Sequence, residues 1–289
     1  MSKTDEIIMD RKLRARRRPV MMTAGGCLIA FMALAALFAS RLAPFDPAEA
    51  DPRPDNVLLP PGRGHIMGTD DLGRDLFSRM IHGGRVSLSV GLIAVGISLV
   101  IGVIVGALAG YFGGWLDSLL MRFAELVMIF PAFYFILMVL AFLGPSLGNV
   151  MVVIGIFSWP GLCRLVRAEF LSLREREYVL AARSLGAGHL RLIFRHLLPN
   201  ALAPVFVYVT LAVGGAILLE SSISFLGLGA QPPTASWGNI IAAGRHYVES
   251  AWWMTLFPGL AILITVLSYN LLGEGLRDRL DPRLRGGER

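Results

Sequence analysis

Five long stretches without a charged residue constrain this chain more than any other feature of its sequence. They cover residues 19–40, 86–116, 126–163, 196–219 and 250–273, and the shortest has 22 residues. A helix needs about 20 apolar residues to cross the hydrocarbon core of a membrane, whereas a buried helix of a soluble protein needs about 10–14. Each stretch therefore predicts at least one transmembrane helix.

The stretch 126–163 has room for two helices separated by a tight turn. Gly144-Pro145 and Gly148-Asn149 interrupt it, and a proline cannot continue a helix without losing a backbone hydrogen bond. The first stretch is longer than the apolar part of a signal peptide, which has about 7–15 residues, so we expect it to persist as the first helix. The sequence thus predicts an all-α, polytopic membrane protein with six transmembrane helices.

Overall composition points the same way. Hydrophobic residues make up 55% of the chain and charged residues 17%, against about 45–50% and about 25% in soluble domains. This excludes a disordered chain and argues against an ordinary soluble enzyme.

The basic residues predict which side of the membrane each connection faces. With the N-terminus in the cytoplasm, 20 of the 27 Lys and Arg fall in inside segments and 7 in outside segments, as the positive-inside rule requires. Both ends of the chain are therefore expected inside, and the formal net charge of +6 follows from this topology and from attraction to anionic lipid. Nucleic-acid binding by the basic run 11–18 fits less well, because this run adjoins a membrane helix.

This topology divides the chain into successive parts. We expect a cytoplasmic basic N-terminus at 1–18, a first transmembrane helix at 19–41, an extracytoplasmic segment with a short interfacial helix at 42–85, and a core with five transmembrane helices at 86–289. Within the core, 164–198 and 274–289 are expected in the cytoplasm and 220–250 outside.

Several kinds of chemistry lack their sequence patterns. A phosphate-binding P-loop ends in Gly-Lys followed by Ser or Thr, but the chain has only Lys3 and Lys12, and neither follows a glycine. Cys27 and Cys163 predict no disulfide framework, and no Cys/His cluster has zinc spacing. The uncharged stretches disfavour a proton-driven carrier, while Na⁺ coordination by backbone carbonyls stays open. We therefore assign no catalytic, cofactor-binding or metal-binding residue, and the substrate-binding residues are unknown.

The inside segment between the fourth and fifth predicted helices is the most informative. Tyr178 and residues 180–182 favour a helix, and Gly186 stands where it would end, since glycine readily adopts the left-handed C′ conformation. A second, amphipathic helix would follow, with Leu190, Ile193, Phe194 and Leu197 on one side. Pro199 is expected to stop or redirect it. The result is a helix–turn–helix with small residues at its tip, which another protein could approach closely.

This segment resembles the signature loop of permease subunits of ATP-binding-cassette (ABC) importers. The positions that match are Ala181, Ala182, Gly186, Leu198 and Pro199, whereas Leu180 and His196 depart from the family pattern. The resemblance implies the type I ABC importer permease fold and a coupling loop that docks on an ATPase subunit. It assigns this role to Tyr178, Ala181, Ala182, Arg183, Gly186, Gly188, Leu198 and Pro199.

Three further segments narrow the resemblance. Residues 68–79, 227–238 and 270–283 are similar to the second permease subunit of the dipeptide/oligopeptide/nickel importer family. Membership would imply a heterodimer with a homologous permease, two ABC ATPase subunits that bind ATP and Mg, an extracytoplasmic solute-binding protein, and a location in the bacterial inner membrane. No nucleic-acid partner is expected.

Residue types in and next to the two segments expected outside the cytoplasm predict local structure. Thr69 is a good N-cap, so we expect a short interfacial helix that carries Asp70 and Asp71 in its first turn and ends at Gly83-Gly84. Three tryptophans, Trp237, Trp252 and Trp253, suit the membrane interface.

A stripe of glycines on the second span predicts close helix packing. Gly102, Gly106, Gly110 and Gly114 recur at every fourth residue, a spacing that lets another helix approach. We expect packing within the subunit rather than at a subunit interface.

The leading hypothesis is a non-catalytic permease subunit that forms half of the translocation pore for dipeptides or oligopeptides. A nickel or metal chelate, glutathione or another small solute is an alternative cargo. The alternatives of a different class are a self-sufficient channel or secondary carrier, and a membrane scaffold.

Overall fold

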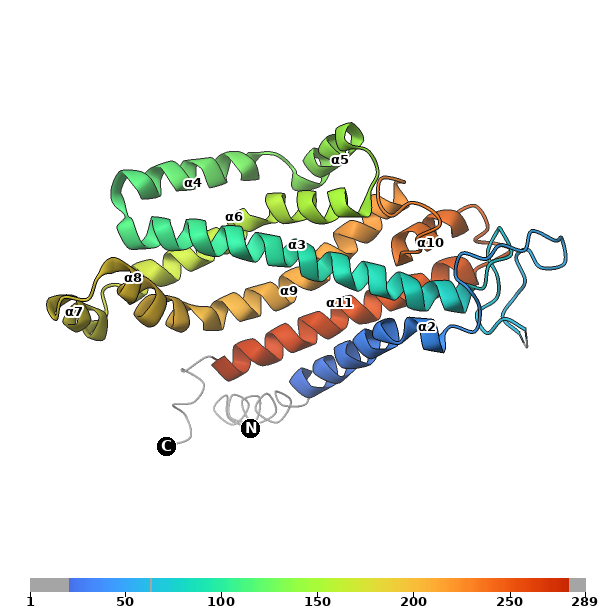
Figure 1. The fold of residues 1–289 in the computed structure, drawn as a ribbon, viewed down its shortest axis with the longest axis horizontal. Coiled ribbons are helices and arrows are strands. Elements are labelled where there is room, and N and C mark those ends of the chain that lie inside the picture. Colours follow the sequence, from blue (N-terminus) through green and yellow to red (C-terminus); the bar gives the residue numbers. More distant parts are fainter. Residues whose placement is uncertain (1–20, 63, 281–289) are drawn as a thin grey trace, which may run out of the picture.

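The computed structural model describes residues 21–62 and 64–280. Four long helices run roughly along the bundle axis (Figure 1): α3 (Leu76–Phe112), α6 (Leu147–Leu173), α9 (Leu198–Phe225) and α11 (Trp253–Leu280). The only β-structure in the described residues is an isolated bridge between Thr69 and Asp75. The all-α prediction is therefore confirmed.

The structure supports fewer membrane crossings than the six predicted. Four helices are long and apolar enough to cross a membrane, and α9 contributes to one that starts at His189. A fifth crossing results if α4 (Gly114–Ile129) and α5 (Ala132–Leu143), which are bent by 82°, count as one broken span. The helix Met21–Leu37 is apolar but has fewer than 18 residues. The count of six and the N-in/C-in orientation stay predictions, and the segments 1–18 and 281–289 lie outside the described residues.

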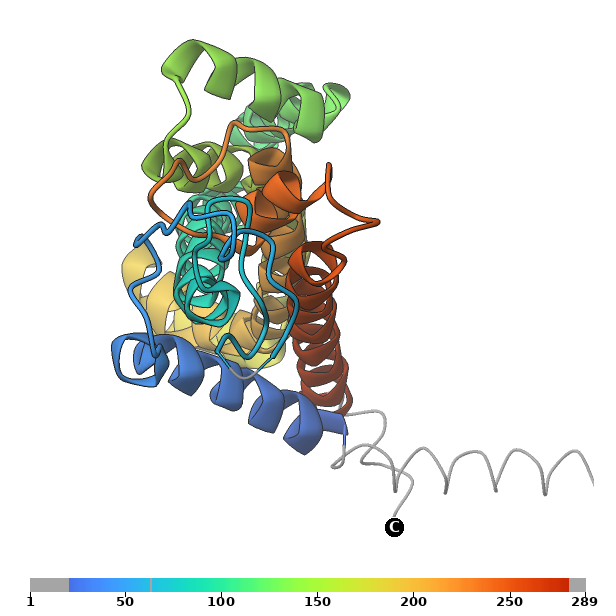
Figure 2. The same ribbon diagram turned by 90° about the vertical axis from the view of Figure 1, so that its right-hand side faces the viewer.

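The outer helices flank the bundle on two sides. Viewed from the end that carries α10 (Trp237–Gly244), the helix Met21–Leu37 and its extension α2 (Ala39–Leu42) lie opposite the α4–α5 pair (Figure 2). Gly25 allows this first helix to approach α11, because a Cβ there would be 2.7 Å from the Ser268 carbonyl oxygen.

The turn before α6 is confirmed at only one of its two predicted positions. Gly144 ends α5 with a φ of +84°, and its N–H donates to the Leu140 carbonyl at 2.9 Å. Gly148 and Asn149, however, lie inside the first turn of α6. The Asn149 amide donates to the carbonyls of Leu143 and Gly144 at 3.2 and 3.0 Å, so this residue completes the end of α5 while remaining helical.

Sequence reasoning missed the helix α4 and its attachment. The Asp117 carboxylate accepts two hydrogen bonds, at 2.5 and 2.6 Å, from the Arg167 guanidinium of α6. The rings of Phe123 and Trp159 stack with centroids 5.9 Å apart. Pro131 follows α4 and breaks the chain into the bent pair, because it cannot donate a helical hydrogen bond.

The glycine stripe packs α3 against α6, as expected within one subunit. A Cβ on Gly102 would be 3.0 Å from Leu162 Cβ, one on Gly106 2.5 Å from the Cys163 carbonyl oxygen, and one on Gly110 2.6 Å from Phe170 Cβ. The prediction is wrong for Gly114. This residue lies beyond the end of α3, has a φ of +60°, and faces no atom within 4 Å.

The start of α3 corrects the predicted interfacial helix. Thr69 does not cap a helix but pairs with Asp75, and Asp75 is the true N-cap, accepting from the Ser78 N–H at 2.7 Å. The helix then continues through Gly83 and Gly84 to Phe112. These glycines do not end it because they provide room for α10: a Cβ on Gly84 would be 3.0 Å from the Trp237 ring.

Candidate functional site

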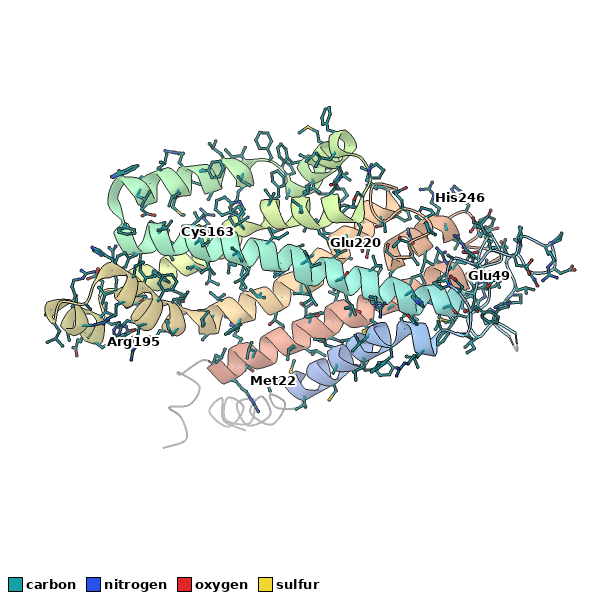
Figure 3. All side chains as sticks on the ribbon, in the orientation of Figure 1. Met22, Glu49, Cys163, Arg195, Glu220 and His246 are labelled. Carbon is teal, nitrogen blue, oxygen red and sulfur yellow. The ribbon has the colours of Figure 1, made fainter. Side chains whose placement is uncertain are left out.

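The predicted coupling loop projects from one end of the bundle. It consists of α7 (Glu177–Ser184), α8 (His189–Arg191) and the π-helical turn η1 (Leu192–Leu197), and Figure 1 shows it at the end opposite α10. Figure 3 likewise places Arg195 at this end and Glu220 toward the other.

Gly186 ends α7 with the predicted left-handed backbone. Its φ is +82°, its N–H donates to the Arg183 carbonyl at 3.0 Å, and the Ala187 N–H donates to the Ala182 carbonyl at 3.1 Å. These two bonds form a Schellman motif, which satisfies carbonyls that the end of a helix leaves unpaired. The turn that the sequence predicted is therefore confirmed.

Pro199 does not stop the helix that follows. The π-helical turn leads directly into α9, and the Leu198 N–H donates to the Ile193 carbonyl five residues earlier. Pro199 then stands in the first turn of α9, where a missing N–H costs little. The chain therefore passes from the loop into the membrane helix without a break.

The loop residues named by the resemblance divide into exposed and partly covered groups. Tyr178, Ala181, Arg183, Gly186, Gly188 and Pro199 are exposed, whereas Ala182 and Leu198 are half-buried. Beneath them the buried Val179 packs into a core cluster with Phe170 and Leu197. The matched residues therefore do not surround one pocket: most of them form a surface, supported from below.

Three large apolar side chains on this surface were not among the predicted coupling residues, although the sequence placed two of them, Leu190 and Phe194, on one side of a helix. Leu185 is 89% exposed, Leu190 72% and Phe194 63%. The predicted amphipathic face is split, because Ile193 and Leu197 are buried while Leu190 and Phe194 point outward. Their i,i+4 spacing was the available signal. Such side chains, exposed together, are typical of a protein–protein or membrane contact.

Basic residues border this apolar surface. A cavity of about 450 Å³ is lined by Ala182, Leu185, Ala187, Arg191, Arg195 and His196. The loop can therefore offer small and apolar residues together with positive charge to an acidic partner surface.

A hydrogen bond connects the loop to the end of α3. The Tyr111 hydroxyl lies 2.7 Å from His189 Nδ1, and the two rings meet edge to face with centroids 5.6 Å apart. Nearby, the Arg174 guanidinium donates to the Gly110 carbonyl at 3.1 Å. Displacement of α8 is thus opposed by α3, which runs the full length of the bundle.

We expect Tyr111→Phe to loosen this connection without unfolding the chain. The change removes one hydrogen bond while keeping the ring, at a cost of about 1 kcal/mol. Amide hydrogen exchange should become roughly fivefold faster at Leu192, whose N–H donates to the Gly188 carbonyl at 3.0 Å. Tyr134→Phe is the matched control, since Tyr134 is exposed and forms no hydrogen bond with another described residue. Equal exchange rates in the two variants would contradict the role of Tyr111.

The opposite end of the bundle is held by a buried polar network. Asp70 accepts from Arg74 Nε at 2.7 Å and lies 3.3 Å from Arg79 Nε, so the side chains of this i,i+4 pair meet in a turn that precedes α3. Burial, together with the neighbouring Asp70 carboxylate, raises the pKa of Asp71. This network positions the segment that precedes α3.

Two of the predicted interfacial tryptophans are instead buried in the protein. Trp237 Nε1 donates to the Met80 carbonyl, and Trp253 Nε1 donates to the Thr69 carbonyl, both at 3.0 Å. Trp252 is 48% exposed. The interfacial prediction is therefore wrong for Trp237 and Trp253, because their indole N–H groups are bonded to carbonyls inside the end of the bundle that carries α10.

Glu220 is a buried acid that sequence reasoning overlooked. It directly follows an uncharged stretch, and α9 extends past it to Phe225. Its carboxylate accepts from Ser224 Oγ at 2.6 Å and from Ser87 Oγ at 3.3 Å. Ser87 Oγ in turn accepts from the Trp237 N–H at 3.2 Å. The group thus joins α3, α9 and α10, and the signal that could have revealed it is a glutamate followed by serines one and four residues later.

Comparisons with known proteins agree with this geometry. The family described as "Binding-protein-dependent transport system inner membrane component" matches residues 102–286, and "N-terminal TM domain of oligopeptide transport permease C" matches 13–61. A dipeptide transport system permease protein of Alkalihalophilus pseudofirmus is 43% identical over 90% of this chain and 85% of its own length. A di/tripeptide transport system permease protein of Pseudomonas aeruginosa is 45% identical over 90% and 88%. A glutathione transport system permease protein of Escherichia coli is 43% identical over 94% and 89%.

Proposed function

Because this chain belongs to the family of binding-protein-dependent transport system inner membrane components, we propose that it is a permease subunit of an ABC importer for small peptides. The observation that carries the proposal is the α7–α8 surface. It is exposed, apolar and basic, and it continues directly into the long membrane helix α9. A chain without a P-loop cannot bind ATP through that motif. A separate ATPase would therefore have to drive its movements by docking on such a surface.

We assign the α7 end of the bundle to the cytoplasm. The positive-inside count supports this orientation, and Met22 lies beside Gly275 near the end of α11, so both outer helices reach the same side. The helix Met21–Leu37 would then be the first of six crossings, and the end with α10 would face the solute-binding protein. The membrane would be the bacterial inner membrane.

The proposed complex contains a homologous permease as the second half of a heterodimer and two ABC ATPase subunits. Apolar side chains on α4 and α5 support a large partner or lipid contact, since Trp115, Tyr134 and Phe142 are 77%, 70% and 85% exposed. In this complex, ATP and Mg are bound by the ATPase subunits. This chain contributes no catalytic group.

The mechanism follows from the rigid attachment of the loop. ATP binding draws the two ATPase subunits together, and each carries a docked loop with it. Since the loop joins α9 without a break and α3 through Tyr111, its displacement turns these helices as one body. The pore then opens outward to receive peptide from the binding protein, and hydrolysis of ATP resets it.

Dipeptides are the proposed cargo, supported by the relatives named for dipeptides and di/tripeptides. Glutathione, itself a small peptide, is the alternative, supported by another relative of similar identity.

The test is peptide uptake by the purified complex in proteoliposomes. We expect uptake of Ala-Ala only when the partner permease, both ATPase subunits, the binding protein and ATP are all present. Glutathione offered to the same vesicles decides between the two cargoes. Uptake of Ala-Ala by this chain alone would instead establish a self-sufficient carrier and overturn the proposal.

A further inference from the structure

A cavity of about 580 Å³ opens between α6, α9 and α11, at the end of the bundle that carries α7. Its lining residues are Leu165, Glu169, Asn200, Ala203, Pro204, Val207, Tyr208, Leu211, Arg277 and Leu280. Pockets for small ligands have volumes of about 300–1,000 Å³ and mostly apolar walls with a few polar groups. This cavity has both properties.

Two opposite charges line the cavity without pairing. Glu169, half-buried on α6, and Arg277 on α11 form no ion pair or hydrogen bond with each other or with any other residue that the structure describes. Arg277 has a structural reason for its place, because it lies in the last turn of α11 at the negative end of the helix dipole. Glu169 has no such reason, since the nearby end of α6 disfavours a carboxylate.

A further polar group of the lining lacks a partner among the described residues. The Tyr208 hydroxyl sits over Gly161, where a Cβ would be 2.4 Å from it, and donates to no described residue. The cavity thus offers a carboxylate, a guanidinium group and a hydroxyl.

We infer that this cavity, at the end of the bundle that carries α7, is a binding site for a zwitterionic peptide. Glu169 would accept hydrogen bonds from the α-ammonium group, and Arg277 would donate two to the α-carboxylate, which suits the planar guanidinium. The apolar walls would cover side chains without selecting them. The inference rests on the proposed function, because it takes its ligand from the proposed cargo.

The chemistry of the two ends of a peptide provides the test. The probe is radiolabelled Ala-Ala, together with N-acetyl-Ala-Ala, which lacks the ammonium group, and Ala-Ala amide, which lacks the carboxylate. Equilibrium binding is measured on the complete permease–ATPase complex in nanodiscs, with the binding protein left out. For Ala-Ala we expect about a tenfold loss of affinity in Glu169→Gln and in Arg277→Gln, the effect of one charge-assisted contact.

The loss of affinity in each variant should depend on which terminal charge the peptide carries. Glu169→Gln should leave binding of N-acetyl-Ala-Ala unchanged, and Arg277→Gln should leave binding of Ala-Ala amide unchanged. Glu274→Gln on α11 and Arg164→Gln on α6 are matched controls, since both residues are exposed and outside the cavity lining. Thermal unfolding of each complex verifies that all four variants remain folded.

Two results would overturn the inference. One is an equal change for all three peptides in the cavity variants, and the other is no binding of Ala-Ala to the wild-type complex. If that complex still imports Ala-Ala once the binding protein is added, the proposed function stands and only the site is wrong.

Discussion

Replacing Gly186 by valine should reduce peptide uptake roughly tenfold while leaving the chain folded in the membrane. A residue other than glycine pays about 1–2 kcal/mol in the left-handed region, and the φ of Gly186 is +82°. Relief of this strain would break the bonds to the carbonyls of Arg183 and Ala182. Leu185 and the start of α8 would then lose their fixed positions. The measurement is ATP-dependent uptake, together with the amount of ATPase subunit that co-purifies.

Gly227→Val is the matched control for this prediction. Gly227 has a φ of +85°, it ends α9 with the same pair of hydrogen bonds, to the carbonyls of Ser224 and Ile223, and a Cβ added at either glycine would meet no atom within 4 Å. The substitution therefore introduces a similar strain at the opposite end of the bundle. We expect uptake to stay within about twofold of the wild type, since the local cost is similar but the surface proposed to dock on the ATPase is not involved. If both variants lost uptake equally, the coupling role of the loop would be wrong.

Gly106→Leu should prevent recovery of the assembled complex. The first added atom would be 2.5 Å from the Cys163 carbonyl oxygen and 2.8 Å from Val166 Cβ. Because one of these neighbours is backbone, α3 and α6 must separate rather than merely rearrange a side chain. Overpacking costs about 1–3 kcal/mol where side chains can adjust, so we expect a loss of about 3 kcal/mol or more here. Thermal unfolding and the yield of co-purified partner subunits measure it.

Gly96→Leu provides the comparison on the same helix. A Cβ on Gly96 meets no atom within 4 Å, so the larger side chain extends into open space. Its helix propensity even favours the substitution, by up to about 1 kcal/mol. Normal recovery of the complex with Gly106→Leu, at the level of Gly96→Leu, would show that the close contact between α3 and α6 is dispensable.

Structural features that depend only on residues close together in the sequence could be predicted from it. The turn at Gly186 and the break at Gly144 follow from the backbone freedom of glycine, which is a property of one position. Three positions of the glycine stripe were predicted from their spacing, which puts them on one face of α3. The packing prediction was wrong for Gly114 because α3 ends before this residue, and helix ends are set by only a few capping contacts.

The end of the bundle that carries α10 could not be predicted in the same way. Thr69 has the chemistry of an N-cap, but its N–H donates to the Leu59 carbonyl and its own carbonyl accepts from Trp253. Asp75 takes the capping role because the chain turns at Gly73, whose φ is +73°. The competition between two good caps was decided by contacts with a residue 184 positions away.

Three things followed from the sequence alone: that this chain is a membrane protein, which segments form most of its helices, and which family its motifs resemble. Uncharged length, basic asymmetry and local turn chemistry suffice for these conclusions, because each is written in consecutive residues. Only the tertiary structure decided which polar groups are buried and which apolar ones are exposed. Glu220 meets Ser87 across 133 positions, and Leu190 and Phe194 stay uncovered while Ile193 is buried. Burial and hydrogen bonding depend on which helices become neighbours, and no local pattern contains that information.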